Sequence, residues 1–355
     1  MPGTGALLLS HAAGVAPTAQ TRREQALLEG AALGELHLHV ATLRGDVVAL
    51  GTFHQEPHPP PGNDVASCRR RTGGCAVACG TGFAVVTLAL PHRAALVADA
   101  PSALKPEQVM NRCVRGLLAW LRGGGIEPIY PGLDAITVAR RTLAHLGFAE
   151  TRDGPTLFQA IVAIDASFAD TATLLDRLDP DGRVPMRLVA GDDCTSLAAL
   201  GRAPRGNVDV DVAAMARDVA TAYAATFPAA IGEIDELDAA VTALLETPEA
   251  IGDAALPPAP ELPATAAVEH GHLGQVAAAA RIEQGRVSAF ALTGDFLAPW
   301  WAVDELRARI EGGPPSADAV LAANEAVFDG SRGYLLGLSP EARHRLLVRA
   351  VTEAA

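Results

Sequence analysis

The sequence predicts an α+β fold built from two domains. The chain has 355 residues, 49% of them hydrophobic, which is enough to bury a sizeable core. Segments with helical periodicity are interspersed with short alternating or β-branched runs typical of strands. Residues 251–265 are rich in proline and alanine and lack such periodicity. We therefore expect a larger domain over residues 1–250, a linker over 251–266 and a smaller α+β domain over 267–355.

Charge and cysteine content narrow the possible partners and compartment. The formal net charge of -13 argues against sequence-independent binding of nucleic acid, because such binding needs clustered basic residues. We expect a small molecule or a protein as the partner. Five cysteines do not suggest the disulfide framework of a small secreted domain, and a reducing cytoplasm fits better. No basic residue precedes the apolar run Ala6–Ser10, and Pro91 interrupts a later run, so neither a secretory signal nor a membrane anchor is expected.

Periodicity places the elements of the first domain. Apolar residues at helical spacing predict helices over residues 21–33, 106–122, 171–178, 212–227 and 234–245. Alternating or apolar runs bounded by turns predict strands over residues 36–41, 47–50, 126–129, 135–138, 148–150 and 156–164. The second of these strands is expected to pair with the first.

Histidines near the first strand invite a metal interpretation. His37 and His39 share one face of that strand, and His54 and His58 lie in a loop rich in proline and histidine. No cysteine or carboxylate cluster follows at metal-ligand spacing. A half-buried strand followed by an irregular loop is therefore the favoured interpretation.

The smaller domain is predicted to begin with a hairpin. Residues 274–282 and 286–292 flank the turn 283–285 as two strands. Helical spacing then returns over residues 303–310, 317–328 and 340–352.

The stretch Cys68–Gly82, CRRRTGGCAVACGTG, is the strongest candidate site. Glycine lets backbone N–H groups approach an anion closely, and the planar guanidinium of arginine binds carboxylate or phosphate in a bidentate way. The pairing of these residues favours an acidic small molecule as ligand. The alternative is a surface hairpin turn with solvated arginines.

Five landmarks give the chain a resemblance to the lipoate-protein ligase family, whose superfamily also holds biotin-protein ligases and octanoyltransferases. The run from Arg70 to Gly82 is similar to that family's arginine pair, glycines and Ala-Val. Gly51, Gln55 and Pro57 resemble the family loop, and Pro131–Asp134 resembles its Asn-Asp turn. Thr195–Leu197 resembles the segment that closes the family's core, and Gly294–Phe296 resembles the end of its accessory hairpin.

The resemblance implies a fold, an activity and a site. The fold is a mixed β-sheet covered by helices, with a smaller α+β accessory domain. The activity is the activation of lipoate or octanoate with ATP and Mg²⁺ as an acyl-adenylate, followed by transfer to a lysine of a lipoyl-carrier domain. The residues expected at the substrate are Arg70, Arg71, Thr72, Gly73, Gly74, Cys75, Ala76, Gln55 and Asp134.

Several chemically important family positions differ in this chain. Thr142 takes the position of the family's key lysine, with Arg141 one residue before it, and Lys105 is the only lysine of the chain. Cys79–Gly80 replaces a His-Asp pair, and Gln159–Ala163 replaces a His-Gly-Thr-Leu-Leu segment. Loss of one preorganised donor typically costs about 10²- to 10³-fold in rate. A divergent ligase is therefore expected, with reduced or lost activity left open, and the alternative is a noncatalytic lipoyl- or carrier-binding module.

Cysteine chemistry supplies a further alternative. Octanoyltransferases of the superfamily use a cysteine thioester, and Cys75, Cys79 and Cys194 are candidate nucleophiles, because a thiolate near arginines would have a lowered pKa. A metal site formed by Cys68, Cys75 and Cys79 is weaker, since their spacing matches no common zinc or cluster pattern.

Overall fold

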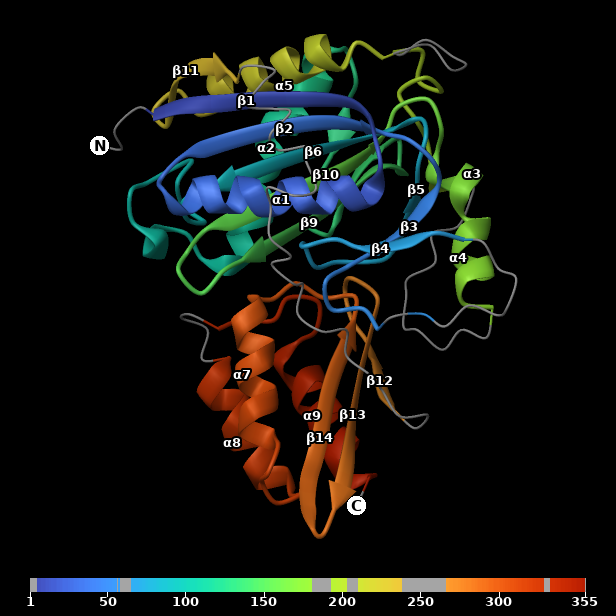
Figure 1. Cartoon of the computed structure of the whole chain (residues 1–355), viewed down its shortest axis with the longest axis vertical. Coiled ribbons are helices and arrows are strands. Elements are labelled where there is room, and N and C mark those ends of the chain that lie inside the picture. Colours follow the sequence, from blue (N-terminus) through green and yellow to red (C-terminus); the bar gives the residue numbers. More distant parts are fainter. Residues whose placement is uncertain are drawn as a thin grey trace.

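The computed structural model describes residues 5–55, 57, 65–180, 193–202, 210–237, 266–328 and 333–354. Its largest part is an eight-stranded mixed sheet in the order β11-β1-β2-β6-β10-β9-β8-β7 (Figure 1). β1 runs parallel to both of its neighbours, and the other neighbouring pairs are antiparallel. The strands are β1 (Gly5–Val15), β2 (Leu36–Leu43), β6 (Phe83–Leu90), β7 (Pro128–Ile129), β8 (Ala135–Val138), β9 (Arg141–Glu150), β10 (Thr156–Ala163) and β11 (Ile231–Glu236).

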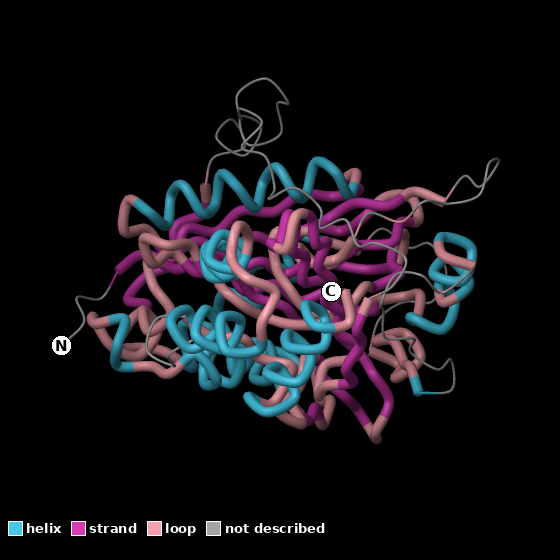
Figure 2. The backbone as a smooth tube through the Cα atoms, turned by 90° about the horizontal axis from the view of Figure 1, so that it is seen from below, coloured by secondary structure: helices cyan, strands magenta, loops and turns pink. Residues whose placement is uncertain are grey.

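Helices cover both faces of this sheet (Figures 1 and 2). α1 (Pro17–Ala32) lies in front of the sheet in Figure 1, and α2 (Pro106–Gly123) and α5 (Val212–Thr226) lie behind it. Because the sheet is covered twice, its central strand β6, FAVVTLAL, is buried at every position. α2 and α5 pack closely at Gly116, where an added Cβ would lie 2.4 Å from the Tyr223 ring.

A second, small sheet carries the arginine–glycine stretch. Its order is β4-β3-β5, with β3 (Val47–Leu50) between β4 (Ser67–Arg69) and β5 (Val77–Cys79). The short helices α3 (Phe168–Thr171) and α4 (Thr173–Leu178) pack on this sheet. The loop from β4 to β5 therefore begins and ends on the two strands that flank β3 in one small sheet.

The C-terminal part has its own sheet and its own hydrophobic core. β12 (Ala267–His270), β13 (Gln275–Glu283) and β14 (Arg286–Gly294) form an antiparallel sheet. α7 (Trp300–Ile310), α8 (Ala317–Val327) and α9 (Pro340–Thr352) pack with it around buried apolar residues, below the large sheet in Figure 1. A one-turn 3-10 helix, η1 (Pro101–Ala103), precedes α2 in the first part.

Buried contacts join the C-terminal part to the rest of the molecule. The rings of Phe53 and Phe296 stack with their centroids 4.4 Å apart. His54 Nε2 lies 3.1 Å from Asp295 Oδ1, and both side chains are fully buried. Tyr334 donates a hydrogen bond of 3.0 Å to Glu150 Oε2 on β9. This junction lies directly against the loop between β4 and β5.

The α+β class is confirmed, and two local predictions are corrected. β3 does not pair with β2, because its neighbours are β4 and β5 in the small sheet. The helix predicted over 234–245 is wrong where it is described, since residues 231–236 form the edge strand β11 beside β1. Residues 238–245 and the predicted linker 251–265 lie outside the described residues, and the domain boundaries stay a prediction.

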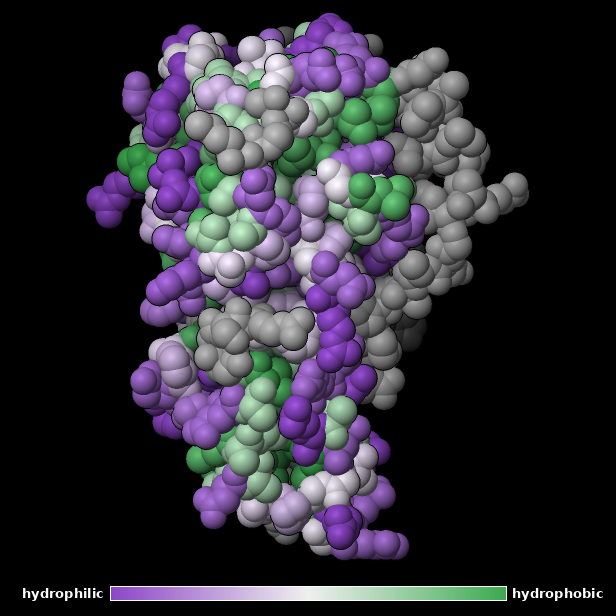
Figure 3. Space-filling view, turned by 90° about the vertical axis from the view of Figure 1, so that its left-hand side faces the viewer, coloured by the Kyte–Doolittle hydropathy of each residue, from purple (hydrophilic) through white to green (hydrophobic). Residues whose placement is uncertain are grey.

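The surface combines polar and apolar side chains. On the face shown in Figure 3, hydrophilic and hydrophobic residues are interspersed over the upper and the lower parts of the molecule. Among the helices of the described ranges, none combines the length and the apolar character that a membrane crossing requires. None of the five cysteines, all of which are described, forms a disulfide.

Candidate functional site

The two arginines of the candidate site are buried inside the protein. Arg70 is 2% exposed and Arg71 is 5% exposed, although they follow the short strand β4 directly. The alternative of a surface hairpin with solvated arginines is therefore wrong. Buried guanidinium groups need compensating acceptors, because the loss of hydration is costly.

Arg70 ties the glycine-containing loop to the central sheet. Its Nη2 donates a hydrogen bond of 2.6 Å to the carbonyl oxygen of Cys75, and its Nη1 lies 3.5 Å from Gln159 Oε1. Gln159 is on β10, next to β6 in the middle of the sheet. One side chain thus holds the loop closed and also contacts the core.

A buried carboxylate of α1 completes this polar network. Glu24 accepts hydrogen bonds from the Gln159 amide and, at 3.2 Å, from the Arg71 backbone N–H. Thr72 donates to Gln159 Oε1 at 3.1 Å. Burial raises the pKa of Glu24 to about 7, against the lowering effects of the Arg71 N–H, of the Arg71 and Arg70 charges and of the Gln159 amide. The network therefore holds a carboxyl group that changes its charge near neutral pH.

We expect Glu24→Gln to remove a component of the pH dependence of stability. Glu24 has a folded-state pKa of about 7 instead of 4.5, so the folded state binds its proton more tightly. The resulting stabilisation is present below pH 4.5 and is lost as the pH rises to 7, by about 3 kcal/mol at most. Urea denaturation at pH 5 and pH 8 should show a smaller fall in unfolding free energy for the variant than for wild type.

Glu29→Gln is the matched control for Glu24→Gln. Glu29 lies on the same helix but is exposed. Its variant should keep the wild-type difference between the two pH values. An unchanged pH dependence in Glu24→Gln would contradict the assignment of a raised pKa to Glu24.

A pocket opens beside this network. Its free volume is about 20 Å³, enough for about one water molecule. Polar groups of Glu24, Arg70 and Gln159 lie on its wall. The rest of the lining is mostly apolar and includes Pro17, Leu43, Val47, Ala49, Val85 and Ile161, together with Cys68 and Cys79. The lining therefore combines apolar walls with a buried polar end, and the walls would have to separate to admit a ligand larger than water.

The glycines allow close backbone contacts at the junction. Gly73 N donates to Phe148 O at 3.2 Å, and Gly74 N donates to Phe296 O at 2.9 Å. An added Cβ on Gly73 would lie 2.5 Å from Phe296 O, and Gly74 has a φ of 101°. These two N–H groups were expected to bind an anion. In this conformation they do not face a ligand, because both donate to carbonyl oxygens of the protein.

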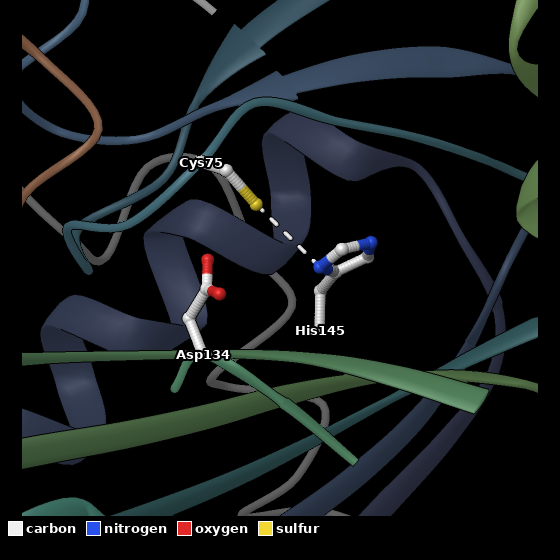
Figure 4. Close-up of side chains that lie close together, drawn as sticks. All are labelled: Cys75, Asp134 and His145. Carbon is white, nitrogen blue, oxygen red and sulfur yellow. Dashed lines mark hydrogen bonds between the residues drawn. The ribbon is translucent and has the colours of Figure 1, made fainter. Parts of the chain in front are cut away.

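Three buried side chains from distant segments meet next to this loop (Figure 4). Cys75 Sγ lies 3.5 Å from His145 Nδ1, and a carboxylate oxygen of Asp134 completes a group whose ligand atoms are all within 4.8 Å of one another. Asp134 and His145 come together because β8 and β9 pair at Ala135 and His145. The sequence placed Cys75 and Asp134 in the site, but gave His145 no role.

Other predicted residues lie at different places. Gln55 is at the junction, where its N–H donates to Thr293 Oγ1 at 2.9 Å. Ala76 packs in the small core around β3. Arg141 is exposed at the start of β9, and Thr142 is bridged to Cys194. Since a strand rises about 3.3 Å per residue, Thr142 lies roughly 10 Å from His145 along β9.

Two members of the network carried only a weak sequence signal. Gln159 is the polar residue in the otherwise apolar centre of β10, TLFQAIVA, and a buried amide must be hydrogen-bonded. Glu24 gave no signal, because helical periodicity predicts apolar residues on the buried face of α1. The structure buries Gln20, Arg23 and Glu24 there together with Leu27, Leu28 and Ala31.

Burial weakens the cysteine alternative at two of its three positions. Burial raises the pKa of Cys194 to about 11, and it raises that of Cys79 further. The expected lowering of these pKa values near arginines is therefore wrong, and fewer reactive thiolates result. The histidines considered as metal ligands have other partners. His39 is hydrogen-bonded to Ser10 at 2.8 Å, and His54 faces Asp295. His58 lies outside the described residues.

Comparisons with known proteins identify the fold. No protein-family model matches the sequence, and no curated protein matches it significantly. Among solved structures, P. falciparum LipL1 in complex with lipoate is similar over 99% of this chain and 100% of that chain, with a TM-score of 0.65 and 12% identity. A bi-partite lipoate protein ligase from Thermoplasma acidophilum is similar over 70% of this chain and 96% of that chain, with a TM-score of 0.43 and 15% identity. This chain therefore shares its fold with P. falciparum LipL1.

Proposed function

We propose that this protein is a divergent lipoate-protein ligase. It would bind lipoate or octanoate in the pocket beside Arg70, activate the acid with ATP, and transfer the acyl group to a lysine of a lipoyl-carrier domain. The observation that carries the proposal is the meeting of an apolar lining with the buried polar groups of Arg70 and Gln159, around a cavity that must widen to admit the acid. The fold shared with P. falciparum LipL1 in complex with lipoate supports it.

The chemistry requires charge compensation beside an apolar slot. In the first step the acyl carboxylate would attack the α-phosphorus of ATP, forming the mixed anhydride and releasing pyrophosphate. In the second step the amine of the carrier lysine would attack the acyl carbon and release AMP. Guanidinium donors suit the developing negative charge, and Arg70 is the one on the pocket wall.

The residues at the pocket fit the acyl acid better than they fit a resident Mg²⁺. Mg²⁺ prefers oxygen ligands and retained waters. Asp134, the expected carboxylate, is grouped instead with the sulfur of Cys75 and the imidazole of His145. Mg²⁺ would therefore enter only with the ATP substrate, and Asp134 would take no part in the reaction.

A noncatalytic acyl-binding module is the second candidate. It is favoured by the N–H groups of Gly73 and Gly74, which are bonded within the protein. The exposed position of Arg141 at the start of β9 favours it as well, since an exposed guanidinium is screened by water.

Two measurements on the purified chain separate the candidates. Calorimetry with lipoate and with octanoate tests the pocket, and mass spectrometry after incubation with lipoate, ATP, Mg²⁺ and a lipoyl-carrier domain tests the chemistry. Lipoyl-AMP and a modified carrier are the expected results. Binding without either product would establish the module instead, and no binding of either acid would overturn both candidates.

A further inference from the structure

The cluster of Cys75, Asp134 and His145 lies outside the lining of the acyl pocket. Its members come from the loop before β5, the residue before β8 and the middle of β9. All three are almost completely buried, at 0%, 0% and 1% exposure. Among the residues that the structure describes, they form the one group of three cysteine, histidine or acidic side chains with metal-binding proximity. We propose that these three side chains form a zinc-binding site.

The distance between sulfur and nitrogen fits tetrahedral coordination of zinc. Zn–S bonds of about 2.3 Å and Zn–N bonds of about 2.0 to 2.1 Å at a tetrahedral angle separate sulfur and nitrogen by about 3.6 Å. The observed distance between Cys75 Sγ and His145 Nδ1 is 3.5 Å. Figure 4 shows the carboxylate of Asp134 beside these two side chains, and all three ligand atoms lie within 4.8 Å of one another. A small movement of the side chains would bring Asp134 into the same coordination sphere.

The charges of the three ligands also suit a buried divalent cation. A cysteine thiolate and an aspartate carboxylate each carry one negative charge, and a ligating histidine is neutral. With Zn²⁺ the group has no net charge, so its burial avoids the large cost of an uncompensated ion. Sulfur and imidazole select zinc over Mg²⁺ or Ca²⁺, which prefer oxygen.

The backbone makes the site rigid. Arg70 holds the loop closed through the Cys75 carbonyl at 2.6 Å, which positions the thiol next to β9. Leu146 N donates to Asp134 O at 2.7 Å, so the carboxylate and His145 are fixed on paired segments. Three protein ligands leave the fourth position of zinc for water, as in sites where the metal keeps an open position.

The test is metal content of the tag-free, full-length chain. After zinc addition and dialysis, mass spectrometry of the elements should find one zinc ion per chain. Cys75→Ala and the near-isosteric Asp134→Asn should each lose most of the bound zinc. Cys113→Ala is the matched control, because Cys113 is an equally buried cysteine in the core of α2, and it should retain zinc like wild type.

Cobalt substitution gives a readout independent of stability. A thiolate-to-cobalt charge-transfer band should be present in wild type and Cys113→Ala and absent from Cys75→Ala, with circular dichroism showing that each variant is folded. Wild type without bound zinc or this band would overturn the proposal, and so would zinc retention in Cys75→Ala. Because no acyl acid or nucleotide is present, this result is independent of the proposed ligase function.

Discussion

Replacing Arg70 with methionine is expected to lower the unfolding free energy by about 3 kcal/mol and to abolish acyl-acid binding. The guanidinium is 2% exposed and donates to Cys75 O and Gln159 Oε1, so its removal leaves buried acceptors without a charged donor. The change also removes the group on the pocket wall that would bind the carboxylate. Urea denaturation and calorimetry with lipoate measure the two effects.

The loss of unfolding free energy in Arg70→Met should also depend on pH. The charge of Arg70 lowers the pKa of Glu24, so without it the folded-state pKa of Glu24 rises further above about 7. At pH 5 Glu24 is mostly protonated in both folded proteins, whereas at pH 8 the variant lacks one of the groups that stabilise its carboxylate, the Arg70 charge. The loss of stability should therefore be larger at pH 8 than at pH 5.

Arg115→Met is the control for this substitution. Arg115 is exposed on α2, and its replacement should change stability by less than about 0.5 kcal/mol at either pH. If Arg70→Met does not fold, Arg70→Lys keeps the charge but loses the planar donor fork, and should be intermediate in stability. Equal losses for Arg70→Met and Arg115→Met would contradict the role assigned to the buried guanidinium.

Gly73→Ala is expected to destabilise the protein by about 1–3 kcal/mol. The added methyl group would lie 2.5 Å from the Phe296 carbonyl oxygen, which is backbone and cannot rotate away. The entropic gain from replacing glycine is about 0.4–1 kcal/mol and is smaller than this clash. Chemical denaturation should therefore show a net loss.

Hydrogen exchange locates the effect of Gly73→Ala. Gly74 N donates to Phe296 O, so displacement of this contact should accelerate exchange of the Gly74 amide. Gly123→Ala is the matched control, because an added Cβ there meets no atom within 4 Å at the end of α2. It should be neutral or slightly stabilising. Wild-type stability and exchange in Gly73→Ala would show that the loop and the C-terminal part do not need this close approach.

Local sequence patterns were sufficient for the elements with a clear period. The apolar stripe of α2, the hairpin around Gln284 and Gly285, and the α+β class follow from the spacing of apolar residues and from turn chemistry. The arginine–glycine stretch was also found, because glycines beside arginines are a chemical signal that needs no three-dimensional information. The resemblance to lipoate-protein ligases rested on this stretch and on the order of four other landmarks.

Strand pairing was not accessible in the same way. β1 joins β2 and β11 in parallel, and β11 is far from both in the sequence. Its sequence, IGEIDE, is mostly exposed at the sheet edge and has no apolar face that periodicity could detect. β3 looked like a partner of β2 because the two are close in the chain, yet packing with α4 places it in the small sheet.

The sequence by itself determined the elements with a clear apolar period and where arginine and glycine are concentrated, because these properties depend on neighbours in the chain. Only the tertiary structure decided that Glu24 and Gln159 surround Arg70 and that Cys75, Asp134 and His145 share one buried space. Such contacts join segments far apart in the chain, and long-range packing of the sheet and the junction, not local periodicity, selects them.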